Sequence, residues 1–211
     1  MSPLIGLVIA YLAGSIPFAY LAGRLVKGID LRTVGSGNLG ATNVFRTLGA
    51  SAGVAVMLLD ITKGAVPVYW LPRLLGAGAP VTETATWWAL AYGVMAILGH
   101  AKPVFLFWQG GGKGVATAAG IFLAVIPVPL LGTFALFALT SVLSGYVSVG
   151  SLAAAVVFPV WVWCVQGGSP VFFTALVVGV FVWWTHRANI ARLRAGTEGR
   201  VFGEKKSGGA S

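Results

Sequence analysis

The sequence predicts an all-α membrane protein of about seven transmembrane helices, with its N terminus outside the cell and its C terminus in the cytoplasm. Charged residues make up 9% and hydrophobic residues 57% of the 211 residues, whereas about a quarter of a soluble globular domain is charged. At roughly 20 residues per span, this length accommodates about seven helices and no separate soluble domain. We therefore expect one polytopic domain over residues 1–198, followed by a flexible cytoplasmic tail over 199–211.

Seven apolar segments follow one another along the chain. The first has no basic stretch ahead of it and continues past the small residues at 13–15, so we expect a retained span rather than a signal peptide. Pro127 and Pro129 interrupt the longest apolar run, and proline breaks helix geometry, so two short spans are expected there. The predicted spans are 3–25, 51–73, 84–101, 114–128, 129–146, 149–166 and 170–186.

Basic residues fall almost entirely on one side of this arrangement. Loops 26–50, 102–113 and 144–150 share that side with the chain from 187 onward, and cytoplasmic loops carry an excess of Lys and Arg. Only Arg73 falls on the other side, and Lys63 lies within a span. The side predicted to be cytoplasmic holds Arg24, Lys27, Arg32, Arg46, Lys102, Lys113, Arg187, Arg192, Arg194, Arg200, Lys205 and Lys206.

The composition argues against several kinds of chemistry. Cys164 is the only cysteine, so no intrachain disulfide can form. Two histidines and five carboxylates, with no His or Cys pair at ligand spacing, argue against a bound transition metal. We expect no metal, no cofactor and no nucleic-acid partner.

The first predicted cytoplasmic loop contains the run VGSGNLGATNVFRTLG. Its glycines allow tight backbone turns, its neutral polar side chains supply hydrogen bonds, and its arginine supplies a fixed cation. This combination fits a cradle for an anion or polar headgroup, and it fits a helix-capping loop equally well. The candidate ligands are Ser36, Gly37, Asn38, Asn43 and Arg46.

The second predicted cytoplasmic loop contains GGGKGVAT, in which Lys113 follows three glycines. Exposed N–H groups, a helix start expected at Val115 and the lysine charge together suit a phosphate. The run is not a nucleotide P-loop, because Gly114 stands where Ser or Thr is required and no βαβ unit surrounds it. A plain interfacial turn with a snorkelling lysine is the alternative. The predicted phosphate contacts are Gly111, Gly112, Lys113 and Gly114.

Further polar residues are expected on the same side of the membrane. His186 and Asn189, at the end of the seventh span, share one helix face because they are three positions apart. An interfacial histidine can be passive, but its pairing with Asn189 favours a site. Ser148 and Ser151 bring hydroxyls to this side, between the fifth and sixth spans. Within the second span, Asp60 and Lys63 are expected to pair, as a structural ion pair facing the bundle interior.

In this order, the segments resemble the small bacterial membrane glycerol-3-phosphate acyltransferases that use acyl phosphate as donor. The matching runs are GSGNLGATNVFR, LDITKG, GHAKPVFL with GGKGVAT, YVSVGS and HRANIARLRAGTE, spread over residues 14–198. Each motif is weak alone, but five in register make a specific match. Two positions depart from the family pattern. Three glycines precede Lys113 where two are usual, and Gly145 stands where a basic residue is common, so that cation is missing or comes from elsewhere.

The resemblance implies that a fatty acyl group moves from acyl phosphate to the 1-hydroxyl of sn-glycerol 3-phosphate, giving lysophosphatidic acid and inorganic phosphate. The partners would be these two substrates and membrane lipid, at the cytoplasmic face of the bacterial inner membrane. Acyl phosphate is already activated, so no covalent nucleophile or metal is demanded. The implied catalytic residues are Lys113, His186 and Asn189, with Lys113 or an N–H group stabilising the oxyanion. The oligomeric state is not specified.

The residues leave two questions open. Neither histidine has an acid five positions on, since His100 leads to Phe105 and His186 to Ala191. Either His186 acts as base without a carboxylate, or the donor phosphate takes the proton while His186 and Asn189 position glycerol 3-phosphate, which we favour. The alternative function is a transporter of small organic anions, which predicts a continuous polar path at mid-membrane.

Overall fold

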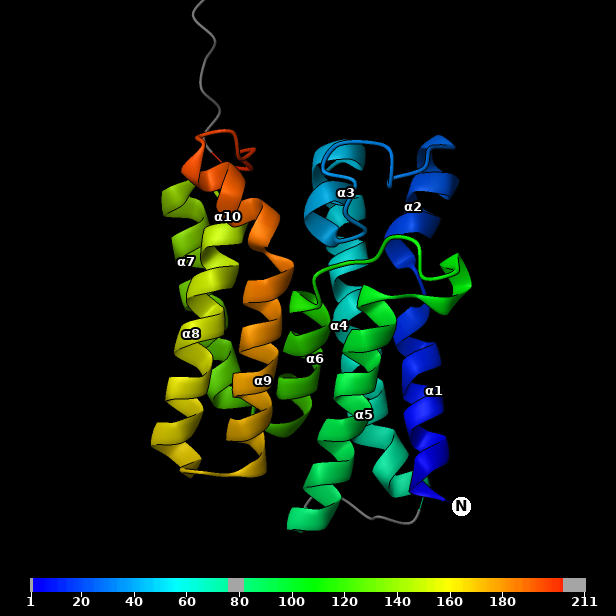
Figure 1. Ribbon diagram of the computed structural model, residues 1–211, viewed down its shortest axis with the longest axis vertical. Helices are drawn as coiled ribbons and strands as arrows, with labels where there is room; N and C mark the ends of the chain where they lie inside the picture. Colours follow the sequence, from blue (N-terminus) through cyan, green and yellow to red (C-terminus); the bar gives the residue numbers. More distant parts are fainter. Residues whose placement is uncertain (1, 76–81, 203–211) are drawn as a thin grey trace, which may run out of the picture.

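The computed structural model describes residues 2–75 and 82–202, and every regular element in these ranges is helical. The elements, labelled in Figure 1, are α1 (Pro3–Ser15), α2 (Phe18–Lys27), α3 (Ala41–Leu48), α4 (Ala50–Leu74), α5 (Glu83–Ala101), the short 3-10 helix η1 (Val104–Leu106), α6 (Val115–Val125), α7 (Pro127–Ser144), α8 (Val147–Gln166), α9 (Pro170–Thr185) and α10 (Arg187–Arg194).

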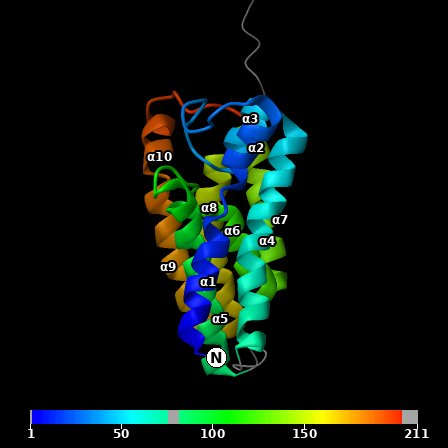
Figure 2. The same cartoon turned by 90° about the vertical axis from the view of Figure 1, so that its right-hand side faces the viewer.

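The long helices share one bundle axis, as Figures 1 and 2 show from two sides. The N-terminal end of α1 lies at one end of the bundle, and α2, α3 and α10 gather at the other. Each of the seven predicted spans overlaps a helix or helix pair. The chain therefore ends its described part at the opposite end of the bundle from where it begins.

Among the described residues, five segments are long and apolar enough to cross a membrane, and a sixth if α9 and α10, bent by 52°, count as one. The five are Pro3–Lys27, Ala50–Leu74, Glu83–Leu106, Pro127–Ser144 and Val147–Gln166. The remaining predicted span, 114–128, is the 11-residue α6. At 1.5 Å per residue it is about 16 Å long, roughly half a hydrocarbon core. The all-helical prediction is confirmed, while the count of seven spans and their orientation stay predictions.

Glycines let the inner helices approach backbone to backbone. A Cβ on Gly64 would overlap the carbonyl oxygen of Thr117, and one on Gly120 would overlap that of Ile61, so α4 and α6 meet without intervening side chains. Such small-residue contacts hold helices together in lipid, where burial of apolar surface between helices gains little. They fix the short helix α6 inside the bundle, and with it the loop that precedes α6.

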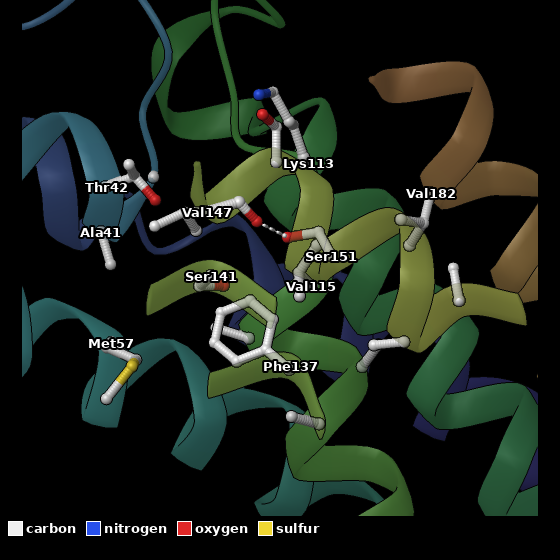
Figure 3. A pocket seen from close by; sticks show the side chains of 18 of the residues that line it. Ala41, Thr42, Met57, Lys113, Val115, Phe137, Ser141, Val147, Ser151 and Val182 are labelled. Atoms are coloured by element: carbon white, nitrogen blue, oxygen red, sulfur yellow. Dashed lines mark hydrogen bonds between the residues drawn. The ribbon is translucent and has the colours of Figure 1, made fainter. Parts of the chain in front are cut away.

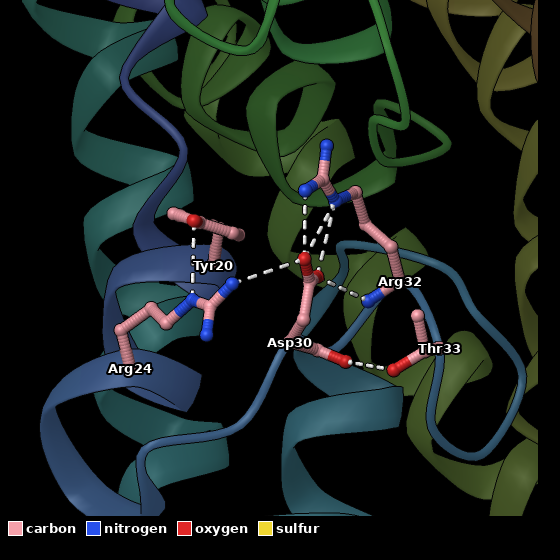
Figure 4. A network of polar contacts seen from close by, with 5 residues as sticks. All are labelled: Tyr20, Arg24, Asp30, Arg32 and Thr33. Atoms are coloured by element: carbon pink, nitrogen blue, oxygen red, sulfur yellow. Dashed lines mark hydrogen bonds and ion pairs between the residues drawn. The ribbon is translucent and has the colours of Figure 1, made fainter.

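The connection between α2 and α3 is shaped by Asp30, as Figure 4 shows. The Asp30 carboxylate accepts hydrogen bonds from the backbone N–H of Arg32 at 3.0 Å and from its guanidinium at 2.7 Å, and it pairs with Arg24 at 3.3 Å. The Nε–H of Arg24 also donates to the hydroxyl of Tyr20 at 3.1 Å. The hydrogen bond from Arg32 lowers the pKa of Asp30 to about 2. The carboxylate therefore stays ionised and holds the start of the polar loop between α2 and α3.

Candidate active site

A cavity of about 410 Å³ lies among α3, α4, α6, α7, α8 and α9 (Figure 3). At the end of the bundle that holds α3 and α10 its walls are polar and cationic. Farther along the helices the walls are apolar, formed by Phe122, Leu130, Phe134, Phe137 and Phe158. The cavity therefore suits a molecule with an anionic head and an apolar tail.

Most of the predicted site residues meet at this cavity. Those that line it are Ser36, Asn38, Asn43, Arg46, Lys113, Gly114, Ser148, Ser151, His186 and Asn189. Gly37, Gly111 and Gly112 do not line it. A Cβ on Gly111 would overlap the carbonyl oxygen of Ala101, and one on Gly112 would overlap the imidazole of His100. Packing against the end of α5 therefore requires these two glycines, and their predicted phosphate contacts stay a prediction.

Asn43 organises the first polar loop. Its Oδ1 accepts a hydrogen bond from the backbone N–H of Ser36 at 3.0 Å, and its Nδ2 donates to the carbonyls of Val34 at 3.1 Å and Leu31 at 3.3 Å. The side chain is 1% exposed. Its polar atoms are thus engaged within the loop. The other polar side chains of this motif that line the cavity are Ser36, Asn38, Thr42 and Arg46.

The polar loop between α2 and α3 and the glycine-rich loop before α6 are joined through the carbonyl of Gly111. This oxygen accepts hydrogen bonds from the Nδ2 of Asn38 at 3.2 Å and from the backbone N–H of Leu39 at 3.1 Å. The neighbouring Gly112 donates its own N–H to the carbonyl of His100 at 3.1 Å. The glycine-rich run is therefore clamped between the first loop and α5, and Lys113 emerges from a fixed stretch of backbone.

Lys113 and Asn189 meet across the mouth of the cavity. The Nζ of Lys113 donates to the Oδ1 of Asn189 at 2.5 Å, and the hydroxyl of Thr185 donates to the carbonyl of Lys113 at 3.3 Å. Burial lowers the pKa of Lys113 to about 8, with Arg192 and Arg46 acting in the same direction and Glu198 against it. A bound anion would favour the ammonium form, because opposite charge stabilises it.

Glu198 completes this network, and the sequence reasoning did not single it out. Its Oε1 accepts hydrogen bonds from Asn189 at 2.6 Å and from the hydroxyl of Ser148 at 3.1 Å, and its Oε2 accepts from Arg192 at 2.7 Å. Burial raises the pKa of Glu198, but these hydrogen bonds outweigh it and leave the pKa below its usual range. The available signal was that one of only five carboxylates falls within the last motif.

His186 sits at the bend between α9 and α10 and is 3% exposed. Its Nδ1 lies 2.8 Å from the carbonyl oxygen of Val182. Since a carbonyl only accepts, Nδ1 carries the hydrogen and Nε2 has the free lone pair. The imidazole can therefore accept a hydrogen bond from a hydroxyl group in the cavity.

Gly145 has a cationic neighbour from the C-terminal segment. Gly145 caps α7 with a φ of 82°, and a Cβ placed there would lie 3.2 Å from the Nε of Arg200. The backbone N–H of Val201 donates to the carbonyl of Gly145 at 2.9 Å. The guanidinium of Arg200 therefore lies beside the position where Gly145 replaces a basic residue of the family pattern.

The segment 199–202, predicted to open a flexible tail, contacts the site. The carbonyl of Gly199 accepts a hydrogen bond from Arg46, and Val201 and Phe202 line the cavity. The rest of the predicted tail lies outside the described residues.

Three helices begin at the mouth of the cavity, and Figure 3 shows their first residues around it. Ala41, Val115 and Val147 open α3, α6 and α8, and all three line the cavity. None of these N-termini has a side-chain cap. Their first N–H groups and positive dipole ends suit anions, and α6 begins where the sequence predicted.

Within residues 2–75 and 82–202, no three His, Cys, Asp or Glu side chains are arranged to hold a metal ion. The thiol of Cys164 is exposed on α8 and does not line the cavity. The cationic side chains at the cavity mouth are Arg46 and Lys113.

Comparison with known proteins agrees with this geometry. The family model described as glycerol-3-phosphate acyltransferase matches residues 4–196. A glycerol-3-phosphate acyltransferase of Geobacter sulfurreducens is 45% identical, covering 95% of this chain and 98% of its own, and one of Chlorobaculum tepidum is 42% identical, covering 94% and 97%.

Two solved structures of PlsY, an integral membrane glycerol 3-phosphate acyltransferase, share the fold. The glycerol 3-phosphate form superposes with a TM-score of 0.85 at 39% identity, covering 95% of this chain and 96% of that one. The lysophosphatidic acid form gives 0.82 at 37% identity, covering 95% of each. The resemblance drawn from the motifs is confirmed: the chain belongs to the glycerol-3-phosphate acyltransferase family, of the PlsY type, and is an all-helical integral membrane enzyme.

Proposed function

We propose that the protein transfers a fatty acyl group from acyl phosphate to the 1-hydroxyl of sn-glycerol 3-phosphate, giving lysophosphatidic acid and inorganic phosphate. The observation that carries this proposal is a single cavity whose cationic mouth continues into an apolar channel. Both substrates are anions, and the donor and the product also carry an acyl chain. The related PlsY structures in glycerol 3-phosphate and lysophosphatidic acid forms support the same assignment.

The mouth of the cavity has enough positive groups for two phosphates. Arg46 offers a planar guanidinium that can bind phosphate through two hydrogen bonds, and Lys113 offers a compact ammonium. The uncapped N-termini of α3, α6 and α8 add backbone N–H donors. We assign glycerol 3-phosphate to the side of the mouth near Asn189 and His186.

The reaction needs no covalent enzyme intermediate. The 1-hydroxyl oxygen attacks the carbonyl carbon of acyl phosphate and forms the ester C–O bond. The bond between that carbon and the phosphate oxygen breaks, and phosphate leaves with the electron pair. Negative charge that builds on the carbonyl oxygen is stabilised by Lys113 or by N–H groups at the start of α6. Because the enzyme holds the activated donor and the hydroxyl in contact, most of the rate enhancement comes from their orientation.

The hydroxyl proton passes to the leaving phosphate. His186 accepts, through Nε2, a hydrogen bond from the neighbouring 2-hydroxyl and so orients glycerol 3-phosphate, which leaves the proton of the 1-hydroxyl free to move to the phosphate. The Nδ1–H of His186 is held by the carbonyl of Val182 rather than by a carboxylate. Asn189 shares this positioning role. A histidine without a carboxylate partner is less suited to take up a proton than one in a His–Asp pair.

The transporter alternative has less support from the cavity. A path for small anions needs polar groups through the middle of the membrane. Here the cationic groups gather at one end. Asp60 and Thr133 also line the cavity, but its deeper walls are formed mostly by apolar residues such as Phe122, Leu130 and Phe158.

The experiment that tests the reaction supplies radiolabelled glycerol 3-phosphate to the purified protein together with acyl phosphate, acyl-CoA or acyl carrier protein thioester in parallel. We expect lysophosphatidic acid from acyl phosphate alone. Turnover only with the thioesters would overturn the donor assignment. No turnover with any donor, in protein that remains folded, would favour transport, which uptake by proteoliposomes would then measure.

We further propose that the cavity mouth faces the cytoplasm of a bacterial inner membrane. Arg24, Lys27, Arg192 and Arg194 lie in α2 and α10, at the end of the bundle that holds the mouth, while Arg73 lies near the far end of α4. Lys and Arg accumulate on the cytoplasmic side. In a Cys164→Ser background, an impermeant thiol reagent should label Thr197→Cys only after cells are opened and Gly168→Cys in intact cells. The reverse pattern would invert the orientation.

A further inference from the structure

Three ionisable side chains form a buried cluster at the wall of the cavity, where two of them, Asp60 and His100, are lining residues, and the reaction above does not use them. The Nζ of Lys63 lies 2.7 Å from the Oδ1 of Asp60, as the sequence predicted, and the Nδ1 of His100 lies 3.6 Å from the same oxygen. All three side chains are 5% exposed or less. We call Asp60, Lys63 and His100 the intramembrane triad.

Stability alone does not account for this cluster. Ionisable groups within a membrane are unfavourable and generally mark a function. Replacing a buried ion pair by apolar side chains is often neutral or stabilising, so charge is not required for holding the bundle together. What the charges provide here is position, because Lys63 and His100 both lie against the same oxygen of Asp60.

The triad connects three parts of the chain. The Nζ of Lys63 donates to the carbonyl of Ile16 at 3.0 Å, at the break between α1 and α2. Asp60 belongs to α4 and lines the cavity. His100 ends α5 and supplies the carbonyl that accepts the N–H of Gly112 at 3.1 Å. The cluster thus links the α1–α2 break to the loop that carries Lys113.

The side chain of His100 also packs closely against Gly112. A Cβ on Gly112 would overlap the Nε2 and Cε1 of the imidazole, so the ring lies directly against this part of the backbone. Asp60 faces the opposite ring nitrogen. The imidazole is therefore held between a carboxylate on α4 and the glycine-rich loop, one residue before Lys113.

We propose that the intramembrane triad is a positioning unit for the reaction: through His100 it fixes the glycine-rich loop 110–114 and so places the Nζ of Lys113 for the phosphate or oxyanion. This inference rests on the role proposed for Lys113. Displacement of a reacting group by about 1 Å can reduce a rate by about 100-fold, even when the altered residue never touches substrate. The triad members are positioning residues rather than catalytic ones.

The test compares three substitutions on α5. His100→Leu removes the contact with Asp60 while keeping an apolar side chain of similar bulk, and His100→Asn keeps an amide N–H near the position of Nδ1. Tyr92→Phe is the matched control, since it removes a buried hydroxyl that donates to the carbonyl of Pro3 at 3.1 Å, far from the loop. Rates are measured against pH, per amount of folded protein.

We expect His100→Leu to lower kcat/KM by about 100-fold and to move the basic limb of its pH profile, because a displaced Lys113 would have different neighbours. His100→Asn should restore most of the rate and the position of the limb, and Tyr92→Phe should match the parent. A purely structural role would lower the yield of folded protein without moving the limb. Parent kcat/KM and an unmoved limb in His100→Leu would overturn the proposal.

A second variant covers the case in which His100→Leu does not fold. Asp60→Asn combined with Lys63→Met removes both charges of the buried pair together, so no single charge is left without a partner. This double variant should show the same loss and the same displaced limb, and a parent profile would overturn the proposal. Lys113→Ala is assayed in parallel. If Lys113→Ala loses activity while the triad variants do not, only the positioning proposal is wrong. If Lys113→Ala remains active, the role proposed for Lys113 is wrong as well.

Discussion

The Oε1 of Glu198 accepts a hydrogen bond from the Nδ2 of Asn189 at 2.6 Å, and this contact determines which end of the Asn189 amide faces the cavity. A carboxylate can only accept, so the amide nitrogen must point to Glu198 and the amide oxygen to Lys113. Lys113 can only donate, and its Nζ does so to that oxygen. Glu198, which itself lines the cavity, thereby sets the orientation of Asn189 and Lys113.

The first prediction concerns the charge of Glu198. Glu198 raises the pKa of Lys113, which burial lowers to about 8. If the ammonium form is needed, kcat/KM of the parent should fall as pH rises through about 8. Glu198→Gln removes the opposing charge, so this fall should begin at lower pH, and the rate at neutral pH should drop roughly tenfold, or ~1.4 kcal/mol.

Glu83→Gln, on an exposed residue in the first turn of α5, serves as the control for loss of a carboxylate and should leave the profile unchanged. A parent profile in Glu198→Gln would mean that Glu198 does not act on Lys113.

Arg46 provides the second prediction. Arg46→Ala should reduce kcat/KM by two orders of magnitude or more, on the scale of losing a phosphate or oxyanion contact. Arg46→Lys restores the charge without the planar pair of donors, so recovery should be partial if the contact to phosphate is bidentate. Full recovery with lysine, measured at saturating acyl phosphate, would show that charge alone is needed.

The fold was largely accessible from the sequence, because its signal is local. Apolar runs and helix-breaking prolines predicted seven apolar segments that each overlap a helix or helix pair, and the break at Pro127 is where α6 gives way to α7. Two short spans were predicted there, but α6 is shorter still than the predicted 114–128. The helix begins after Gly114, which has a φ of 80°. It is held in the bundle by close packing of Gly64 and Gly120 against facing backbone, which composition does not reveal.

The site was accessible only in part, because its members lie far apart in the chain. Lys113, His186 and Asn189 stood out by residue type and motif, and the structure brings them to one cavity. Glu198 lies nine residues beyond Asn189, past the end of α10, so helix periodicity could not pair them. Gly112 lies in a run with the composition of a phosphate-binding loop, yet it packs against the imidazole ring of His100.

The third prediction separates a base from a positioning residue at His186. Because we assign the proton to the donor phosphate, His186→Gln should weaken saturation by glycerol 3-phosphate and regain part of its rate at high substrate concentration. Steady-state kinetics over a wide range of glycerol 3-phosphate measure this. A collapse of kcat with unchanged KM would instead identify His186 as the general base.

The fourth prediction concerns packing of the short helix. Gly120→Ala forces a methyl group into the backbone of α4 at Ile61, where no side chain can move aside, and overpacking of this kind is destabilising by about 1–3 kcal/mol. Thermal unfolding in detergent should show a lower midpoint. Gly168→Ala has ordinary contacts of 3.7 Å or more and should match the parent. Equal midpoints for the two variants would contradict the close approach of α4 and α6.

The central claim is that Lys113 acts on the phosphate or the oxyanion of the reaction, and the rate of lysophosphatidic acid formation by Lys113→Ala tests it most directly. Lys102→Ala is the control, because Lys102 is an exposed lysine at the other end of the same inter-helix segment. With acyl phosphate and glycerol 3-phosphate at saturation, Lys113→Ala should lose two or more orders of magnitude in rate while Lys102→Ala stays near the parent. Near-parent turnover by folded Lys113→Ala would contradict the account.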